Sequence, residues 1–282
     1  MHKILIVQTA FIGDVILATG LIESIHQTFP KAEIDFVLRK GNETILKNHP
    51  FVNKLYVWDK KKNKFFNLIN LILQIRKEKY DLVVNLQRFF STGLMTLFAK
   101  SNNKRGFDKN PFSFCYDKKS AHIIGKNHET YRNFSLISDL INIKYQKPHL
   151  HFTEAEIQKV LPLKSKPFVC MAPASVWITK QLPSAKWAEL ILTIPDNIKI
   201  YFLGAPTDLA LCNEIRLLSS HPNIEILCGM LTLTESAALM QHAEMNYVND
   251  SAPLHLASAV NAPVTSFFCS TVPEFGFGPL SD

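Results

Sequence analysis

The sequence predicts an α/β protein made of two successive Rossmann-like halves. Short apolar segments typical of buried strands alternate with amphipathic segments of period 3.6 along most of the 282 residues. Alternation of this kind indicates parallel sheets covered by helices. A polar stretch with Pro148, Pro162 and Pro167 interrupts the pattern, which then restarts. We therefore expect two domains, residues 1–160 and 161–282, with the carboxyl ends of their strands facing a central cleft where ligands bind.

The elements follow one another in βα order. In the first half, strands are expected at residues 4–8, 34–38, 54–58 and 81–86, and helices at 15–28, 65–76 and 91–99. In the second half, strands are expected at 168–172, 199–203, 224–227, 245–248 and 264–268, and helices at 185–192, 209–219, 234–241 and 253–259.

The composition indicates a globular protein of the cytoplasm. Hydrophobic residues make up 47% and charged residues 20% of the chain, and no apolar run approaches the ~20 residues of a membrane span. The apolar start at residues 4–8 is too short for a signal peptide. The five cysteines contain no C-x-x-C pair, which argues against a zinc site or a disulfide framework.

Charge is distributed unevenly between the halves. Residues 1–160 carry 25 Lys and Arg against 14 Asp and Glu, net +11, whereas residues 161–282 carry 6 against 10, net −4. A basic half can hold an acidic substrate or lie against anionic lipid head groups. Nucleic acid is a weaker candidate partner, because the cations are dispersed and no nucleic-acid-binding signature accompanies them. Arg88, Lys104 and Arg105 are loose candidates for an anionic ligand, with a solvent-exposed role as the simpler interpretation for each.

The turn after the first strand contains Gly13 and Asp14. It has neither the G-x-G-x-x-G spacing of dinucleotide sites nor the spacing of a P-loop, so no nicotinamide cofactor and no ATP hydrolysis is predicted. Gly13 lets the backbone turn tightly, and Asp14 lies at or near the start of the next helix. Asp14 is therefore either a helix cap or a carboxylate available for catalysis in the cleft.

Two junctions in the second half carry polar groups. After the strand at 168–172, Ser175, Thr179 and Lys180 offer hydroxyl and ammonium donors suited to phosphate oxygens. After the strand at 199–203, Asp208 can cap its helix or accept a hydrogen bond from a ribose hydroxyl, with the cap slightly favoured.

The segment 245–259 is the most informative part of the chain. An apolar strand breaks at Asn249-Asp250-Ser251 and continues as a helix, with Ala252, Pro253, Leu254 and His255 in its first turn. A helix start at the carboxyl end of a strand presents free backbone N–H groups and a positive dipole end, which bind phosphates. An ordinary capped helix is the alternative interpretation.

Together these segments resemble glycosyltransferase family 9, the ADP-heptose:lipopolysaccharide heptosyltransferases. The motifs are Gly13-Asp14-Val15, then Ser175, Thr179, Lys180, Pro183, Trp187 and Ala188, then residues 204–208, and finally residues 249–257. The resemblance spans nearly the whole chain and implies a GT-B fold, an inverting transfer and no metal or other cofactor. It makes the first domain the acceptor domain and the second the donor domain.

The same resemblance implies roles for residues. Asp14 matches the general base, Lys180 a contact to the donor phosphates, and Asp208 an acidic contact to the donor. Residues 250–255 match the start of the helix that binds the pyrophosphate. Three departures are visible: the family has Gly where this chain has Ala252, the stretch Cys-Ser-Thr-Val-Pro at residues 269–273 replaces a commoner Gly-Pro-Thr-x-Pro, and the chain ends at Asp282, before the last helix of typical members. The donor domain is therefore expected to lack its final elements.

The implied partners are ADP-heptose, an anionic glycolipid acceptor and the inner membrane surface, which the protein would touch peripherally, with no nucleic acid. Two other functions stay open. A non-catalytic nucleotide-sugar-binding homologue would keep the fold without turnover, although the presence of Asp14 and Lys180 opposes it. A UDP-sugar epimerase of the same architecture would bring acid and base residues of both domains to one sugar carbon.

Overall fold

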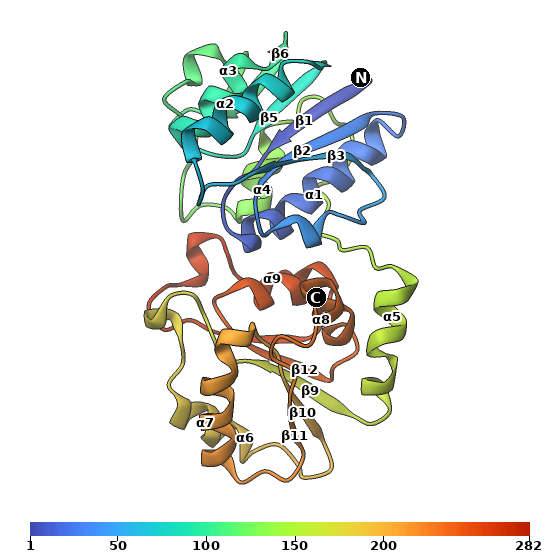
Figure 1. Cartoon of the computed structure of the whole chain (residues 1–282), viewed down its shortest axis with the longest axis vertical. Helices are drawn as coiled ribbons and strands as arrows, with labels where there is room; N and C mark the ends of the chain where they lie inside the picture. Colours follow the sequence, from blue (N-terminus) through green and yellow to red (C-terminus); the bar gives the residue numbers. More distant parts are fainter. The chain divides into compact units, whose positions relative to one another are not determined.

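The computed structural model describes all residues from 1 to 282 and divides the chain into two compact units, Met1–His151 and Phe152–Asp282 (Figure 1). The division falls at 151/152, whereas the sequence places it at 160/161. Helix α5 (Glu154–Val160) belongs to the second unit, because it packs against α8 (Leu233–Met240). Lys159 Nζ lies 3.0 Å from Glu235 Oε2, and Glu156 accepts a hydrogen bond from the Thr234 hydroxyl.

The first unit is built on a six-stranded sheet in the order β3-β2-β1-β5-β7-β8, in which every pair of neighbours is parallel. Its strands are β1 (Lys3–Val7), β2 (Glu33–Arg39), β3 (Val52–Trp58), β5 (Leu82–Asn85), β7 (Lys104–Phe107) and β8 (Lys118–Ser120). The short strands β4 (Lys79–Tyr80) and β6 (Lys100–Ser101) pair with each other separately.

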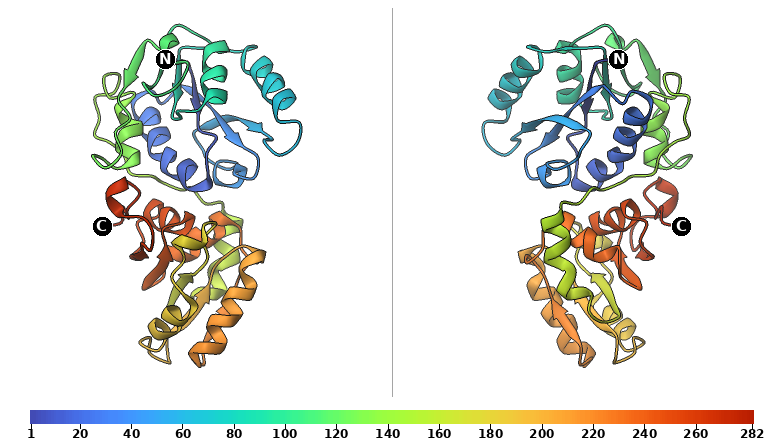
Figure 2. Two further views of the ribbon diagram at one scale, coloured as in Figure 1. Left: turned by 90° about the vertical axis from the view of Figure 1, so that its left-hand side faces the viewer. Right: turned by 90° about the vertical axis from the view of Figure 1, so that its right-hand side faces the viewer.

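Helices cover both faces of this sheet. They are α1 (Ile12–Thr28), α2 (Lys64–Ile75), α3 (Phe90–Phe98) and α4 (Glu129–Ser135). Helices α1 and α4 pack together on one face, and α2 and α3 on the other (Figure 2). Leu5 and Val7 of β1 point toward α2 and α3, where they pack with Leu71 and Met95. The alternation of β1 side chains between two helical layers explains why its whole run is apolar.

The second unit repeats this arrangement on a five-stranded parallel sheet in the order β11-β10-β9-β12-β13. Its strands are β9 (Phe168–Ala172), β10 (Lys199–Phe202), β11 (Ile224–Ile226), β12 (Met245–Asn249) and β13 (Val264–Phe267). Besides α5 and α8, its helices are α6 (Ser184–Ile191), α7 (Leu209–Ser219) and α9 (Ala252–Ala259). Trp187 of α6 is fully buried against this sheet.

In each sheet the order of the strands reverses direction at one point. In the first unit β1 lies between β2 and β5, and in the second unit β9 lies between β10 and β12. The loops that follow the two strands on either side of such a reversal diverge, and ligands bind there in open α/β sheets. The loops after β1 and β5, and those after β9 and β12, are therefore the positions to inspect. No helix of the chain combines the length and the hydrophobicity that crossing a bilayer would require.

Candidate functional site

Lys180 and Asp250 meet at the reversal point of the second sheet. Lys180 closes the short 3-10 turn 178–180 after β9, and Asp250 directly follows β12. Lys180 Nζ lies 2.5 Å from Asp250 Oδ2, and the Thr271 hydroxyl donates to the same oxygen at 2.6 Å. Asp250 is buried, so this pair is shielded from solvent and strong.

The buried side chain of Asn249 fixes the loop that carries Lys180. Its amide nitrogen donates to the Pro173 carbonyl at 2.7 Å, and its amide oxygen accepts from the Leu182 N–H at 3.1 Å. One side chain at the end of β12 therefore holds both ends of the loop 173–182. Gln181 Nε2 adds a bond to the Ser175 carbonyl inside the loop, at 2.7 Å.

Helix α9 begins beside Asp250 without a side-chain cap. Ser251 occupies the N-cap position with extended backbone, but its hydroxyl makes no bond to the helix N–H groups. Ala252 and Pro253 follow in the first turn and are partly exposed. A helix start of this kind keeps backbone donors and positive dipole charge available to an anion.

Two residues expected in this segment are buried instead of lining it. Leu254 is fully buried, so only its backbone could face a ligand, and its N–H already donates to the Ser251 carbonyl at 3.1 Å. The His255 ring is also buried and packs against Phe277, with ring centroids 6.3 Å apart.

The remaining expected donor contacts lie in loops. Thr179 is exposed and Ser175 partly exposed near Lys180. Asp208 does not cap α7 with its side chain; its Oδ2 accepts from the Ala205 N–H at 2.8 Å and so closes the preceding turn. A Cβ on Gly204 would come within 2.9 Å of that oxygen, so a side chain there would displace the Asp208 carboxylate.

In the first unit, Asp14 lies in the first turn of α1, directly after β1. It is the third helical residue rather than the N-cap, which is Phe11. Asp14 is partly exposed as a residue, but its carboxyl group lies in a desolvated environment. Burial and the negative charge of Glu129 raise the pKa of Asp14 to about 7, against hydrogen bonds from the backbone N–H groups of Phe11 and Asp14. A carboxylate with this pKa suits a general base near neutral pH.

The expectation that Gly13 makes a tight turn before α1 is wrong. Gly13 is the second residue of the helix, is buried, and does not have a positive φ. The turn between β1 and α1 is held by other groups: Lys60 Nζ donates to the Thr9 carbonyl at 2.6 Å, and Asn42 Nδ2 to the Ala10 carbonyl at 3.0 Å.

Cations surround this edge of the first sheet. Arg39, at the end of β2, lowers the pKa of Asp14 and stacks over Phe11, 4.5 Å from the ring centroid. Burial and the positive charge of Arg39 lower the pKa of Lys60 to about 8. Burial, Arg88 and Arg132 likewise lower the pKa of His122 to about 4. Burial is the larger cause of both shifts, and the neighbouring cations add to it, so positive charge gathers here and favours an anion.

Lys104 and Arg105 do not join this group. Arg105 is buried and its guanidinium bonds Asp139 and the Leu136 carbonyl. Lys104 Nζ donates to the Leu97 carbonyl at 2.8 Å. Both cations are therefore structural, and Arg88, which is exposed at the end of β5, is the only one of the three at the expected edge.

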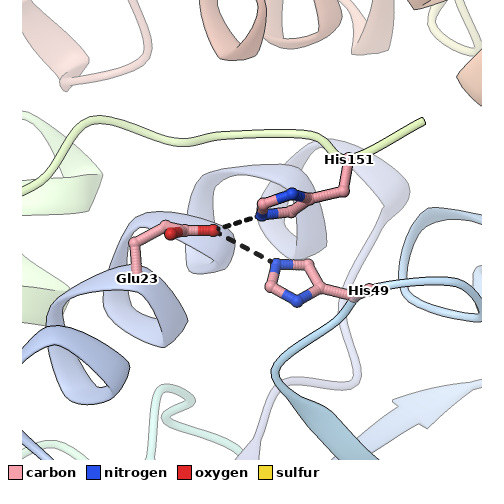
Figure 3. Close-up of side chains that lie close together, drawn as sticks. All are labelled: Glu23, His49 and His151. Atoms are coloured by element: carbon pink, nitrogen blue, oxygen red, sulfur yellow. Dashed lines mark hydrogen bonds and ion pairs between the residues drawn. The ribbon is translucent and has the colours of Figure 1, made fainter. Parts of the chain in front are cut away.

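A separate cluster in the first unit consists of Glu23, His49 and His151, the last of which is the final residue of that unit. In Figure 3, the carboxylate of Glu23 in α1 faces both His49 and His151, with Oε1 2.8 Å from His151 Nε2 and 3.5 Å from His49 Nε2. These ligand atoms lie within 4.8 Å of one another. However, the Phe51 N–H donates to His49 Nδ1 at 3.3 Å, so the neutral ring carries its proton on Nε2. A metal ion would have to bind the lone pair of His49 Nε2, which this proton occupies. We therefore interpret the cluster as the Glu23 carboxylate accepting hydrogen bonds from histidines.

Sequence patterns did not point to several of these residues. Asn249 was visible as the first polar residue of the break after the strand, but nothing in the sequence shows that its amide reaches Pro173 and Leu182. Glu23, His49 and His151 are separated by long stretches of chain, and only the fold brings them together. Arg39 is the last residue of β2, and Lys60 follows the end of β3 by two residues, so their position at strand ends was the available signal.

Known proteins share this fold along the whole chain. The family model described as glycosyltransferase family 9 (heptosyltransferase) matches residues 68–282. Lipopolysaccharide heptosyltransferase 3 of Escherichia coli is 28% identical over 279 residues, which cover 93% of this chain and 82% of that protein. A family 9 glycosyltransferase from Veillonella parvula superposes with a TM-score of 0.88 at 20% identity, covering 99% of this chain and 84% of that one. E. coli heptosyltransferase WaaC with ADP gives 0.81 at 20%, covering 98% and 90%.

The fold is therefore that of the GT-B class of glycosyltransferases, as the sequence predicts. Within that class, the chain belongs to glycosyltransferase family 9, the heptosyltransferases. It is a glycosyltransferase.

Proposed function

We propose that this glycosyltransferase moves heptose from ADP-heptose to the core of a lipopolysaccharide acceptor, with inversion at the anomeric carbon. The sugar and the acceptor follow from the name of the E. coli relative, and the nucleotide from the ADP in the WaaC structure. The observation that carries the proposal is Lys180 held at an uncapped helix start, which suits a diphosphate.

The second unit binds the donor in this proposal. Backbone N–H groups at Ser251 and Ala252 and the dipole of α9 face the diphosphate, and Lys180 supplies a mobile ammonium beside them. Asp250, which pairs with Lys180, can also accept hydrogen bonds from hydroxyl groups of the sugar. The same donors stabilise the charge that develops on ADP as it leaves, so the chain itself supplies the positive charge that a divalent cation would otherwise provide.

The first unit supplies the base. Asp14 takes the proton of the acceptor hydroxyl as that oxygen bonds to the anomeric carbon and the bond to the ADP oxygen breaks. A pKa of about 7 leaves a large fraction of Asp14 ionised at neutral pH while keeping the carboxylate basic. A well-placed base contributes about 10²–10⁴-fold to the rate.

The acceptor is an anionic glycolipid in this proposal, and the protein works at the cytoplasmic face of the inner membrane. Arg39 lowers the pKa of Asp14, and Lys60 donates to the Thr9 carbonyl just before α1, so both provide positive charge near Asp14. An acidic sugar held there would place a neighbouring hydroxyl near the carboxylate.

The test is a transfer assay in excess EDTA with ADP-heptose and a deep-core glycolipid, followed by mass spectrometry of the lipid. The expected product gains one heptose, and ADP is released in equal amount. Hydrolysis of ADP-heptose without sugar on the lipid would show a different acceptor. Binding of ADP that disappears in EDTA and returns with Mg²⁺ or Mn²⁺ would contradict the metal-independent donor site.

A further inference from the structure

The outer side of α2 is apolar and exposed. Phe65 and Phe66 are 73% and 74% exposed, and Ile69 and Leu73 are 53% and 55% exposed. At 3.6 residues per turn, positions 65, 69 and 73 lie one above another, and position 66 lies beside them. These side chains form one continuous stripe rather than scattered contacts.

This stripe is additional to the face of α2 that builds the core. Helix α2 buries a second row of apolar side chains against the sheet: Leu68, Leu71, Ile72 and Ile75. A surface helix needs only one apolar face to fold, so the fold does not explain the outer stripe. Its neighbour α3 extends it with Phe98, which is 42% exposed and lies 5.8 Å from the Arg76 guanidinium. Figure 1 shows α2 and α3 next to each other, away from α1. We call Phe65, Phe66, Ile69, Leu73 and Phe98 the α2 surface.

Positive charge predominates in the chain segments that carry the α2 surface. Residues 60–77 contain six Lys and Arg and no Asp or Glu, and residues 88–104 contain three and none. Exposed lysines lie at the start of α2 and exposed cations at its end. The two acids that flank residues 60–77 are both paired: Glu78 Oε2 lies 3.0 Å from Lys3 Nζ, and Asp59 Oδ2 lies 2.9 Å from Lys40 Nζ.

A combination of exposed phenylalanines and an excess of cations over acids fits a bilayer better than a second copy of the chain. Two copies meeting at this face would bring like charges together, whereas anionic head groups attract the same cations. Phenylalanine and leucine side chains bury in the boundary between head groups and acyl chains, as in helices that lie in the membrane plane. We propose that the α2 surface docks the enzyme on an anionic lipid bilayer. The biological purpose of this docking rests on the proposed action on a membrane glycolipid. The experiment that tests docking does not depend on that proposed function.

The test is flotation of the 282-residue protein with vesicles of phosphatidylethanolamine and phosphatidylglycerol, compared with vesicles of phosphatidylcholine alone. The wild type is expected to bind the anionic vesicles, and to bind less as salt shortens the Debye length from ~10 Å at 0.1 M to ~3 Å at 1 M. Phe65→Ser/Phe66→Ser is expected to lower the partition by about tenfold or more, because two large apolar side chains no longer enter the bilayer.

The matched control is Leu217→Ser/Leu218→Ser in α7, which removes two exposed apolar side chains from the second unit, 79% and 54% exposed. It should float like the wild type. Equal flotation of the wild type and the Phe65/Phe66 variant would overturn the proposal. A second result would also overturn it: the wild type forms a dimer in ultracentrifugation, only the Phe65/Phe66 variant loses that dimer, and the wild type does not bind vesicles.

The docking test is separable from the transferase activity. Both serine variants should transfer heptose to a delipidated, water-soluble acceptor as fast as the wild type, because the α2 surface contains no residue of the proposed donor or base site. No transfer by any of the proteins would refute the proposed function while leaving the vesicle result to decide docking. Thermal unfolding of each variant checks that it remains folded.

Discussion

Lys180 and Asp250 lie 70 residues apart in the sequence, and their Nζ and Oδ2 atoms lie 2.5 Å apart in the structure. The pair joins the loop after β9 to the loop after β12, the two strands that flank the reversal of strand order in the second sheet. Removing either charge leaves the other without its ion-pair partner. A substitution at either position is therefore expected to change both the free energy of unfolding and the affinity for a ligand bound there.

Lys180→Ala is expected to weaken ADP binding by about 1.5–3 kcal/mol, or roughly 10- to 150-fold, the range of one charge-assisted hydrogen bond. Calorimetry measures the change. Lys186→Ala is the matched control, since Lys186 is an exposed lysine paired only with Glu189 on α6. Unchanged ADP affinity in the Lys180 variant would remove this lysine from the donor site.

The same substitution should lower the free energy of unfolding, because it leaves the buried Asp250 carboxylate with Thr271 as its remaining side-chain partner. Adding Asp250→Asn to Lys180→Ala should recover part of that loss, since the uncompensated charge is gone. ADP affinity should not recover. A double variant as unstable as Lys180→Ala alone would show that the pair contributes little to the fold.

Ala252→Pro should lower ADP affinity while leaving the fold intact. Proline is tolerated at the first position of a helix and removes one backbone N–H there. The preceding residue, Ser251, already has the extended backbone that proline requires before it, with φ −155° and ψ −179°. Ser251→Ala is the control, because it keeps every backbone donor. If both variants bind ADP as the wild type does, the start of α9 does not hold the diphosphate.

The Glu23 cluster should make stability depend on pH. Burial lowers the pKa of His49 below its usual 6.5, and His149 is shifted in the same direction. Below about pH 6.5 the unfolded chain therefore binds more protons than the folded chain, and the free energy of unfolding falls as pH falls. Each extra proton adds a slope of about 1.4 kcal/mol per pH unit.

His49→Gln should flatten this slope below about pH 6.5, whereas His2→Gln, at an exposed position, should not. Urea unfolding at a series of pH values gives both slopes. Parallel curves for the wild type and His49→Gln would show that His49 titrates alike in both states.

Asp14→Asn should stabilise the fold at alkaline pH. The folded pKa is about 7 against an ordinary 3.8, so below pH ~4 the group is protonated in both states and no penalty arises. Between about pH 4 and 7, Asp14 is ionised in the unfolded chain but still protonated in the folded protein, so the free energy of unfolding falls as pH rises. Above about pH 7 this loss of stability is complete and amounts to up to ~4 kcal/mol. Asn has no such penalty. A less stable Asp14→Asn at pH 8 would indicate that the carboxylate mainly serves the start of α1.

Most of the fold could be predicted from the sequence, because long apolar strands and periodic helices dominate it. Strands β7 and β8 were not predicted, since Lys104, Arg105, Lys118 and Lys119 give them the composition of a loop. Their pairing at the sheet edge depends on tertiary contacts, such as the Asn85 amide that reaches the Tyr116 hydroxyl.

The candidate site was predictable where it follows a strand and not where it depends on side-chain geometry. Lys180, Asp250 and Asp14 each come soon after a buried strand, which placed them at sheet edges. The pairing of Lys180 with Asp250 and the buried orientation of His255 depend on how loops pack, and local sequence does not encode that. Gly13 was wrongly predicted from its residue type. A glycine was expected to make a turn, but Gly13 is the second residue of α1.

The most direct test is the pH dependence of kcat/KM for heptose transfer by the wild type and by Asp14→Asn, with ADP affinity measured in parallel. If Asp14 is the base, wild-type kcat/KM rises with pH and levels off above about 7, the pKa of that carboxyl group. Asp14→Asn should lose about 10²–10⁴-fold in kcat, keep ADP affinity within a few-fold, and lose this pH dependence. An Asp14→Asn enzyme that retains wild-type turnover, or that keeps the same rise near pH 7, would contradict the assignment of Asp14 as the base.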